Sequence, residues 1–209
     1  MLKAWGNIIC AIDTETTGLD ADINEITEIC IIPLDNSLNI YKGDDINGSP
    51  MKPFHIFMRP YNVDNIDDVA LRVQKKTLRE VMVNGVDPQV AADCFDTWFQ
   101  KLPMDHGRGK RIVPLGHNYQ FDKGFITKWL TATTYNDCFH YHYKDSMIAA
   151  GYINDRADFR LEPRPFDRLK LQDIVTKFCL GKRPQHTALD DAYQTALIYK
   201  RICEMFTMP

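Results

Sequence analysis

The apolar run from Ile8 to Ile12 constrains the fold of this chain more than any other stretch. A continuous apolar run of this length suits a strand that is buried on both faces, so helices must cover both sides of its sheet. The segments 25–34 and 54–58 are two further apolar stretches, which we expect to pair as antiparallel hairpins. Segment 36–53 between them is rich in Asn, Asp, Gly and Ser, which predicts a loop or a long hairpin tip.

The rest of the chain alternates helical and extended patterns. Asp87-Pro88 supplies an N-cap followed by a first-turn proline, and apolar residues from Val90 to Leu102 then recur at helical spacing. Strands are predicted over 111–115 and 139–143, and helices over 64–84, 118–131, 146–152, 167–180 and 187–206. Three early strands followed by alternating helices and strands predict an α/β fold with a mixed sheet and helices on both faces.

Length and composition narrow the class of protein. The 209 residues are 44% hydrophobic and contain no low-complexity tract, which predicts a single domain over 1–209. The apolar runs are too short to span a bilayer, and the scattered cysteines include no Cys-x-x-Cys pair. We therefore expect a soluble, cytoplasmic protein with no membrane partner. At a formal net charge of −3, binding to nucleic acid would require a local basic patch or bound cations.

Two aspartates lie on the apolar stripes of predicted helices. Asp122 precedes Phe125 and Ile126 at helical spacing, and Asp191 follows Ala188 in the same way. Because an unpaired buried carboxylate costs several kcal/mol, such groups are normally paired, protonated or bound to a metal. For each aspartate taken alone, a structural salt bridge or a helix cap is the alternative interpretation.

Two more acids follow the first predicted strand. Asp13 and Glu15 alternate with Thr14, so an extended chain projects both to the same side, about 7 Å apart at their Cα atoms. The Thr-Thr-Gly turn that follows can present backbone N–H groups to an anion. Like charges held together raise one another's pKa unless a cation neutralises them, and hard divalent cations suit oxygen ligands. A solvated surface pair is the alternative interpretation.

His186 lies just before the last predicted helix. Thr187 and Asp190 form a Thr-x-x-Asp pattern that resembles a capping box and makes Thr187 the predicted N-cap. His186 then lies at the rim of a site that includes Asp191, and it titrates near neutral pH. An exposed loop histidine is the alternative. The pair His140 and His142 has no further ligands to complete a zinc site, so we predict none.

Three segments resemble the motifs of the DEDDh 3′→5′ exonucleases, a family that includes RNase T and the proofreading subunits of bacterial DNA polymerases. They are residues 12–18 (IDTETTG), 117–122 (HNYQFD) and 186–192 (HTALDDA), and their order and spacing also match. The resemblance implies an RNase H-like fold with a central five-stranded mixed β-sheet flanked by α-helices. This chain departs from the pattern at Ile12, where Phe is frequent, and in 36–53, which resembles an insertion.

The resemblance also implies a set of site residues. Two divalent cations, Mg²⁺ or Mn²⁺, would be held by Asp13, Glu15, Asp122 and Asp191, with His186 as the general base. The positions expected to contact the terminal nucleotide or to line its approach are Thr16, Thr17, Leu19, His117, Asn118 and Phe121. Simple core packing is the alternative for the two apolar members of this set.

The function expected from these features is hydrolysis of phosphodiester bonds at the 3′ end of single-stranded or frayed DNA, with release of 5′-nucleotides. DNA is favoured over RNA as the polymer. The alternatives are a 3′→5′ exoribonuclease and a proofreading or interaction subunit that docks on a DNA polymerase. The sequence does not exclude a homo-oligomer. Segment 155–170 interleaves basic residues with Phe159 and Phe166, as a strand-binding surface or a plain solvated loop would. Lys75, Lys76 and Arg79 are expected to form a solvated helix face.

Overall fold

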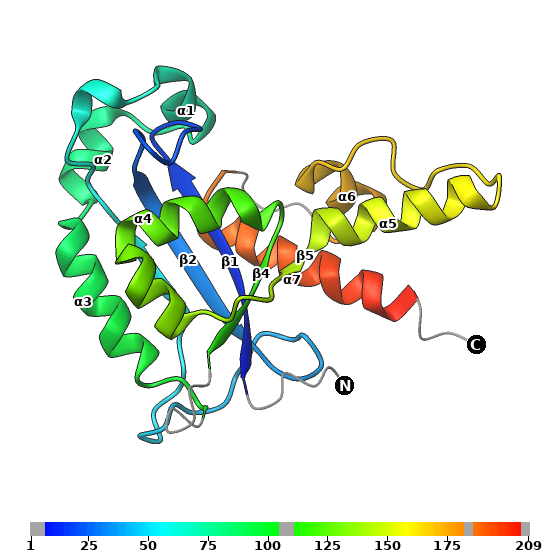
Figure 1. The fold of residues 1–209 in the computed structure, drawn as a ribbon, viewed down its shortest axis with the longest axis horizontal. Helices are drawn as coiled ribbons and strands as arrows, with labels where there is room; N and C mark the ends of the chain where they lie inside the picture. The colour runs from blue at the N-terminus through cyan, green and yellow to red at the C-terminus, as the bar shows by residue number, and fades with distance from the viewer. Residues whose placement is uncertain (1–6, 105–110, 182–185, 206–209) are drawn as a thin grey trace.

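A five-stranded mixed sheet forms the centre of the molecule (Figure 1). The computed structural model describes residues 7–104, 111–181 and 186–205. The strands are β1 (Ile8–Thr16), β2 (Ile26–Leu34), β3 (Phe54–Phe57), β4 (Ile112–Gly116) and β5 (Lys144–Asp145), in the order β3-β2-β1-β4-β5. β1 pairs antiparallel with β2 and parallel with β4, and β2 pairs antiparallel with β3. The predicted hairpins and the predicted mixed sheet are confirmed.

Helices cover both faces of this sheet (Figure 1). They are α1 (Asp68–Val73), α2 (Leu78–Asn84), α3 (Pro88–Phe99), α4 (Tyr119–Cys138), α5 (Ser146–Phe159), α6 (Leu171–Lys177) and α7 (Ala188–Met205), with the 3₁₀ turn η1 (Val63–Asn65) before α1. α3 and α4 pack on one face, and α7 packs on the other. Among the described residues, no helix has both the length and the apolar character needed to cross a membrane.

Side-chain alternation along β1 divides the core into two layers. Cys10 and Ile12 face α3 and α4, whereas Ile9 and Ala11 face α7. Cys10, Ala11 and Ile12 have 0% exposed surface, so this strand is buried on both faces, as the apolar run predicts. The same alternation sends the side chains of Asp13 and Glu15 to the α7 side and that of Thr14 to the α4 side.

The fifth strand differs from its prediction. The structure places β5 at Lys144–Asp145 rather than at 139–143. Phe139 makes one isolated bridge with Ile112, and the chain then turns, because the His140 ring accepts a hydrogen bond from the backbone N–H of His142. The aromatic residues of this segment favour a strand, but the local side-chain hydrogen bond produces a turn.

Four of the predicted helices also differ in their bounds. The helix predicted over 64–84 is broken into η1, α1 and α2, because Lys75 has a left-handed φ of 56° and Thr77 begins α2 with a capping box to Glu80. α4 runs to Cys138 rather than 131, across a non-helical Thr131. α5 extends to Phe159 rather than 152, and α6 spans Leu171–Lys177 rather than 167–180. The predicted cap of α3 is confirmed, since Asp87 accepts a hydrogen bond from the backbone of Gln89.

Candidate active site

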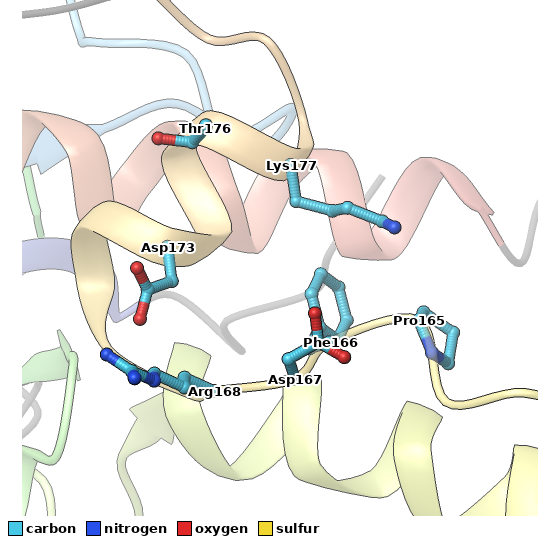
Figure 2. Close-up of a pocket in the computed structure, with 7 residues that line it drawn as sticks. All are labelled: Pro165, Phe166, Asp167, Arg168, Asp173, Thr176 and Lys177. Atoms are coloured by element: carbon cyan, nitrogen blue, oxygen red, sulfur yellow. The ribbon is translucent and has the colours of Figure 1, made fainter.

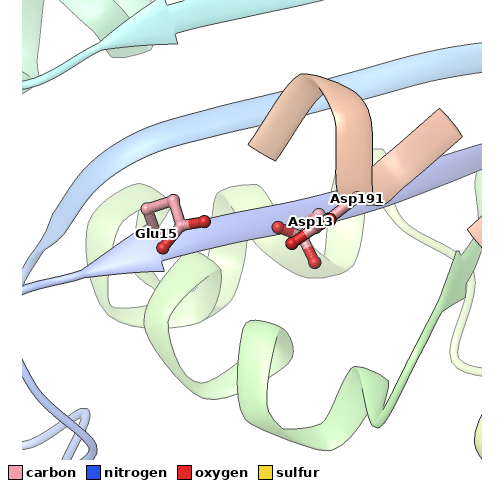
Figure 3. Close-up of side chains that lie close together, drawn as sticks. All are labelled: Asp13, Glu15 and Asp191. Carbon is pink, nitrogen blue, oxygen red and sulfur yellow. The ribbon is translucent and has the colours of Figure 1, made fainter. Parts of the chain in front are cut away.

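Three acidic side chains converge where β1 meets the start of α7. One carboxylate oxygen from each of Asp13, Glu15 and Asp191 lies within 4.8 Å of the others. Figure 3 shows that Asp13 and Glu15 extend from β1 and that Asp191 approaches them from α7. Oxygen atoms at this separation can share divalent cations, whose bonds to oxygen are about 2.0–2.6 Å long. The acidic group could therefore hold metal.

Small residues and a capped first turn position Asp191. Ala188, Ala192 and Ala196 on α7 pack against the sheet, so the helix approaches β1 closely. The Thr187 hydroxyl accepts a hydrogen bond from the backbone N–H of Asp190 at 3.2 Å and donates one to its carboxylate at 3.0 Å. The predicted cap at Thr187 is present, and it orients the first turn so that the next residue, Asp191, faces β1.

The electrostatics of the site disfavour charged carboxylates without cations. Burial, followed by repulsion from Asp122 and Asp191, raises the pKa of Asp13 well above its usual range. Burial raises the pKa of Glu15 to about 8, although the Lys76 ammonium opposes this shift. Burial likewise raises the pKa of Asp191 to about 6. A group of acids that resists ionisation becomes stable as carboxylates when cations neutralise it.

Asp122 lies beside this group but does not join it. Its side chain on α4 is 3% exposed, and its Oδ1 accepts hydrogen bonds from the backbone N–H of Thr14 at 2.9 Å and from the Thr14 hydroxyl at 2.7 Å. Burial raises the pKa of Asp122 to about 7, and the Thr14 hydrogen bonds oppose this shift. The inward orientation that helical spacing predicts is present. Asp122 is not within 4.8 Å of all three other acids, but its charge is the first of the neighbouring charges that raise the pKa of Asp13.

His186 lies at the rim, immediately before α7. It is partly buried and has a left-handed φ of 65°. Its backbone N–H donates a hydrogen bond to Asp191 that opposes the rise in the Asp191 pKa. Burial, followed by the nearby charge of Lys75, lowers the pKa of His186 below its usual value. The imidazole is therefore neutral near pH 7 and can accept a proton.

Three residues of the β1–β2 turn were predicted to contact substrate. Thr16 and Thr17 stabilise the turn by hydrogen bonds, whereas Leu19 is exposed to solvent. The Thr16 hydroxyl donates to the Gly18 carbonyl at 2.6 Å, and the Thr17 hydroxyl accepts from the Glu25 backbone at 2.9 Å. A side chain at Gly18 would collide with Asn24, so this position requires glycine. Leu19 is 83% exposed, which is incompatible with core packing and leaves it available to contact a base.

The second motif contributes three predicted substrate-contacting residues, His117, Asn118 and Phe121, which differ in exposure. His117 is partly buried and held at both ring nitrogens, since Nδ1 bonds to the Ser146 hydroxyl and Nε2 to the Leu169 carbonyl, both at 2.8 Å. Asn118 is exposed and adopts a left-handed φ of 68° at the start of α4. Phe121 is partly buried against Phe125, with ring centroids 4.9 Å apart. Asn118 is thus the accessible member of this set.

Sequence reasoning missed a further buried acid beside the site, Glu28. Glu28 on β2 is the cross-strand partner of Glu15 and is 1% exposed. It forms an ion pair with Lys76, and its Oε1 lies at hydrogen-bond distance, 2.8 Å, from His55 Nε2. The Lys76 side chain is 19% exposed, so the predicted solvated helix face is wrong for this residue. Glu28 interrupts the apolar stretch 26–34 as the one charged residue, which is the signal that could have revealed it.

The basic and aromatic segment 155–170 is mostly exposed, and Phe166 anchors it to the core. Phe166 is 3% exposed and packs edge-on against Phe178, and Arg164 pairs with Asp158 at 2.6 Å. A pocket of about 320 Å³ lies between residues 165–168 and α6 (Figure 2). None of the residues predicted to be catalytic line it. Phe159 is 91% exposed and is the aromatic side chain of this segment that remains accessible.

The fold and a family match together define the class of this protein as a nuclease. The family model described as exonuclease, RNase_T, matches residues 10–199. The chain belongs to this exonuclease family, and it is a 3′→5′ exonuclease of the DEDD class with an RNase H-like fold. The predicted family, the predicted fold class and the predicted enzyme class are confirmed.

Several individual proteins are similar to this chain over most of its length. An oligoribonuclease from Buchnera aphidicola subsp. Schizaphis graminum is 23% identical over 91% of this chain and 90% of its own length. A PolC-type DNA polymerase III from Thermotoga petrophila is 27% identical over 93% of this chain, which spans 12% of the polymerase. Among solved structures, E. coli exonuclease I in complex with a dT13 oligonucleotide has a TM-score of 0.66 at 16% identity, over 96% of this chain and 42% of its own. Cell-death related nuclease 4 has a TM-score of 0.69 at 15% identity, over 95% and 64% of the two chains.

Proposed function

We propose that this chain is a two-metal-ion 3′→5′ exonuclease that hydrolyses phosphodiester bonds at the 3′ end of single-stranded or frayed DNA and releases 5′-nucleotides. The observation that carries the proposal is the convergence of Asp13, Glu15 and Asp191 within 4.8 Å. These acids come from two elements far apart in the sequence, and they are buried strongly enough to raise their pKa values. Such a group of acids is costly to assemble unless a bound cation neutralises its charge.

The donor set fits hard divalent cations such as Mg²⁺ or Mn²⁺, because every converging atom is a carboxylate oxygen. Asp13, Glu15 and Asp191 would hold the cations, with Asp122 supporting the site from the α4 side. Bound cations of this kind lower the pKa of an attacking water and stabilise the departing oxygen of a phosphodiester. Without them, the cluster of carboxylates would repel the phosphate of the substrate.

The protein's own residues would supply proton transfer and orientation. The neutral His186 imidazole accepts the proton of the attacking water, since its lowered pKa keeps it unprotonated near pH 7. Leu19, exposed on the β1–β2 turn, contacts the terminal base. Thr16 and Thr17 fix the shape of that turn. These roles assign proton transfer to the rim histidine and strand-end recognition to the turn.

The relatives support DNA and RNA as candidate substrates to different degrees. DNA is favoured by the PolC-type polymerases, which are 27% and 24% identical to this chain. RNA is the second candidate, because the oligoribonuclease matches over 90% of its own length. A DNA polymerase is a proposed partner on the same PolC evidence, since the matching part is 12% of each polymerase. Oligomeric state and the cytoplasmic location stay predictions from sequence.

Digestion of labelled strands tests the proposed function. With Mg²⁺ or Mn²⁺, the wild-type protein should convert a 5′-labelled single strand into a ladder of progressively shorter products, and a 3′-labelled strand into labelled mononucleotide. EDTA and Asp13→Ala should both abolish the ladder. A faster ladder from DNA than from the RNA of the same sequence supports DNA as substrate, and the reverse supports the exoribonuclease. Cleavage that persists in EDTA or in Asp13→Ala would refute the metal site.

A further inference from the structure

The turn between α1 and α2 brings two lysines to the rim of the candidate active site. Gln74 donates from its side-chain amide to the Thr16 carbonyl at 2.7 Å and accepts from the Thr27 hydroxyl at 3.0 Å, so the turn is tied to both β1 and β2. Lys76 pairs with Glu28, the cross-strand partner of Glu15. Lys75 lies between these two anchored residues and is exposed.

The backbone at Lys75 has a conformation that favours glycine. α1 ends in a Schellman motif, in which the N–H of Lys75 donates to the Arg72 carbonyl at 3.1 Å and the N–H of Lys76 donates to the Leu71 carbonyl at 3.0 Å. Lys75 occupies the left-handed position of this motif, with φ 56°. A residue with a Cβ atom is strained there, whereas glycine is not.

Strain alone does not distinguish Lys75 from two other residues. Leu161 after α5 and Cys179 after α6 have φ values of 56° and 54° in the same motif. The location of Lys75 is what differs, because its charge lies close enough to His186 to contribute to the lowered pKa of that imidazole. A long, exposed cationic side chain is thus held on a strained backbone near the predicted general base.

We propose that Lys75 binds a backbone phosphate of the substrate strand at the entrance to the acidic group. Lys76 cannot readily fill this role, because the buried Glu28 already engages its ammonium. A strand that approaches Asp13, Glu15 and Asp191 meets negative charge, and an exposed ammonium at the rim offsets that repulsion. This inference rests on the proposed function, since it requires a nucleic-acid substrate.

The substitution Lys75→Gly separates a binding role from a structural one, because it should improve stability and impair binding. Glycine relieves the left-handed strain, so the melting temperature should rise by about 2–4 °C. Loss of one phosphate contact should weaken binding at low salt several-fold. It should also reduce the slope of log K against log salt concentration by about 0.7, the value for one contact to a single strand. Lys75→Arg should keep the wild-type slope.

The measurement is fluorescence anisotropy of a 5′-fluorescein oligothymidylate with phosphorothioate 3′ linkages, which slow cleavage, in Mg²⁺ over a salt series. Cys179→Gly is the matched control, since it relieves the same strain after α6 without removing a positive charge and should keep the wild-type slope. An unchanged slope in Lys75→Gly overturns the role of Lys75. If Lys75→Gly folds poorly, Lys75→Gln removes the charge on a similar side chain, and its slope decides in the same way. A wild-type protein that binds no strand refutes the proposed function instead.

Discussion

Replacing Asp191 with asparagine is expected to reduce cleavage at a 3′ end by on the order of 10³-fold, the scale of losing a metal ligand's contribution to the transition state. Asparagine keeps the shape of the side chain but removes the charge that divalent cations require. Asp191 supplies the α7 oxygen of the acidic group, which Asp13 and Glu15 on β1 cannot replace. The measurement is the initial rate of shortening of a 5′-labelled strand under single-turnover conditions.

The neighbouring acid provides a matched control for this substitution. Asp190 belongs to the same helical turn but contacts the Thr187 cap. Asp190→Asn should therefore keep the rate within about threefold of wild type, because asparagine also serves in helix caps. In EDTA at pH 8, Asp191→Asn should melt no lower than wild type. Burial raises the Asp191 pKa to about 6, so an ionised carboxylate is removed from a site that disfavours it. Equal losses in the two variants would contradict the assignment.

Replacing His186 with asparagine is expected to slow cleavage by roughly 10²–10⁴-fold, the usual contribution of general acid–base catalysis. Asparagine suits the left-handed backbone at this position, so the loss should reflect the imidazole rather than strain. The backbone N–H that donates to Asp191 is retained. The measurement is the single-turnover rate with saturating metal.

The pH profile tests the same role. A general base works when unprotonated, so the wild-type rate should rise as pH increases through the pKa of His186 and then level off. Burial and Lys75 place that pKa below its usual value, so the levelling should be reached at a lower pH than an unperturbed imidazole would give. His186→Asn should lose this rise, whereas the exposed control His142→Asn should keep it. A His186→Asn profile that matches wild type would contradict proton transfer by His186.

The acids of the site were predictable from sequence because regular periodicity determines where their side chains point. Alternation along β1 placed Asp13 and Glu15 on one side, and helical spacing turned Asp122 and Asp191 inward. Periodicity does not predict which residue far away in the sequence will form a hydrogen bond with a given side chain. The hydrogen bonds from Thr14 hold Asp122 on the α4 side of β1, and they join residues 108 positions apart in the chain.

The errors in the fold also have local causes. The break after α1 was not predicted because Lys75 stands where glycine normally marks a helix end. The end of α6 was placed too late for the same reason, since Cys179 follows this helix. Glu28 was missed because its importance depends on the register that pairs it with Glu15, which sequence spacing does not show.

The most direct test of the account is the binding of Mn²⁺ to the acidic group, measured by calorimetry and by electron paramagnetic resonance without substrate. The wild-type protein should bind Mn²⁺, up to two ions per chain as a two-metal site requires. Asp13→Asn should bind it at least tenfold more weakly, about 1.4 kcal/mol or more, while Asp190→Asn should bind it as wild type does. Mn²⁺ binding that is absent from the wild type, or that Asp13→Asn leaves unchanged, would contradict a metal site built from Asp13, Glu15 and Asp191.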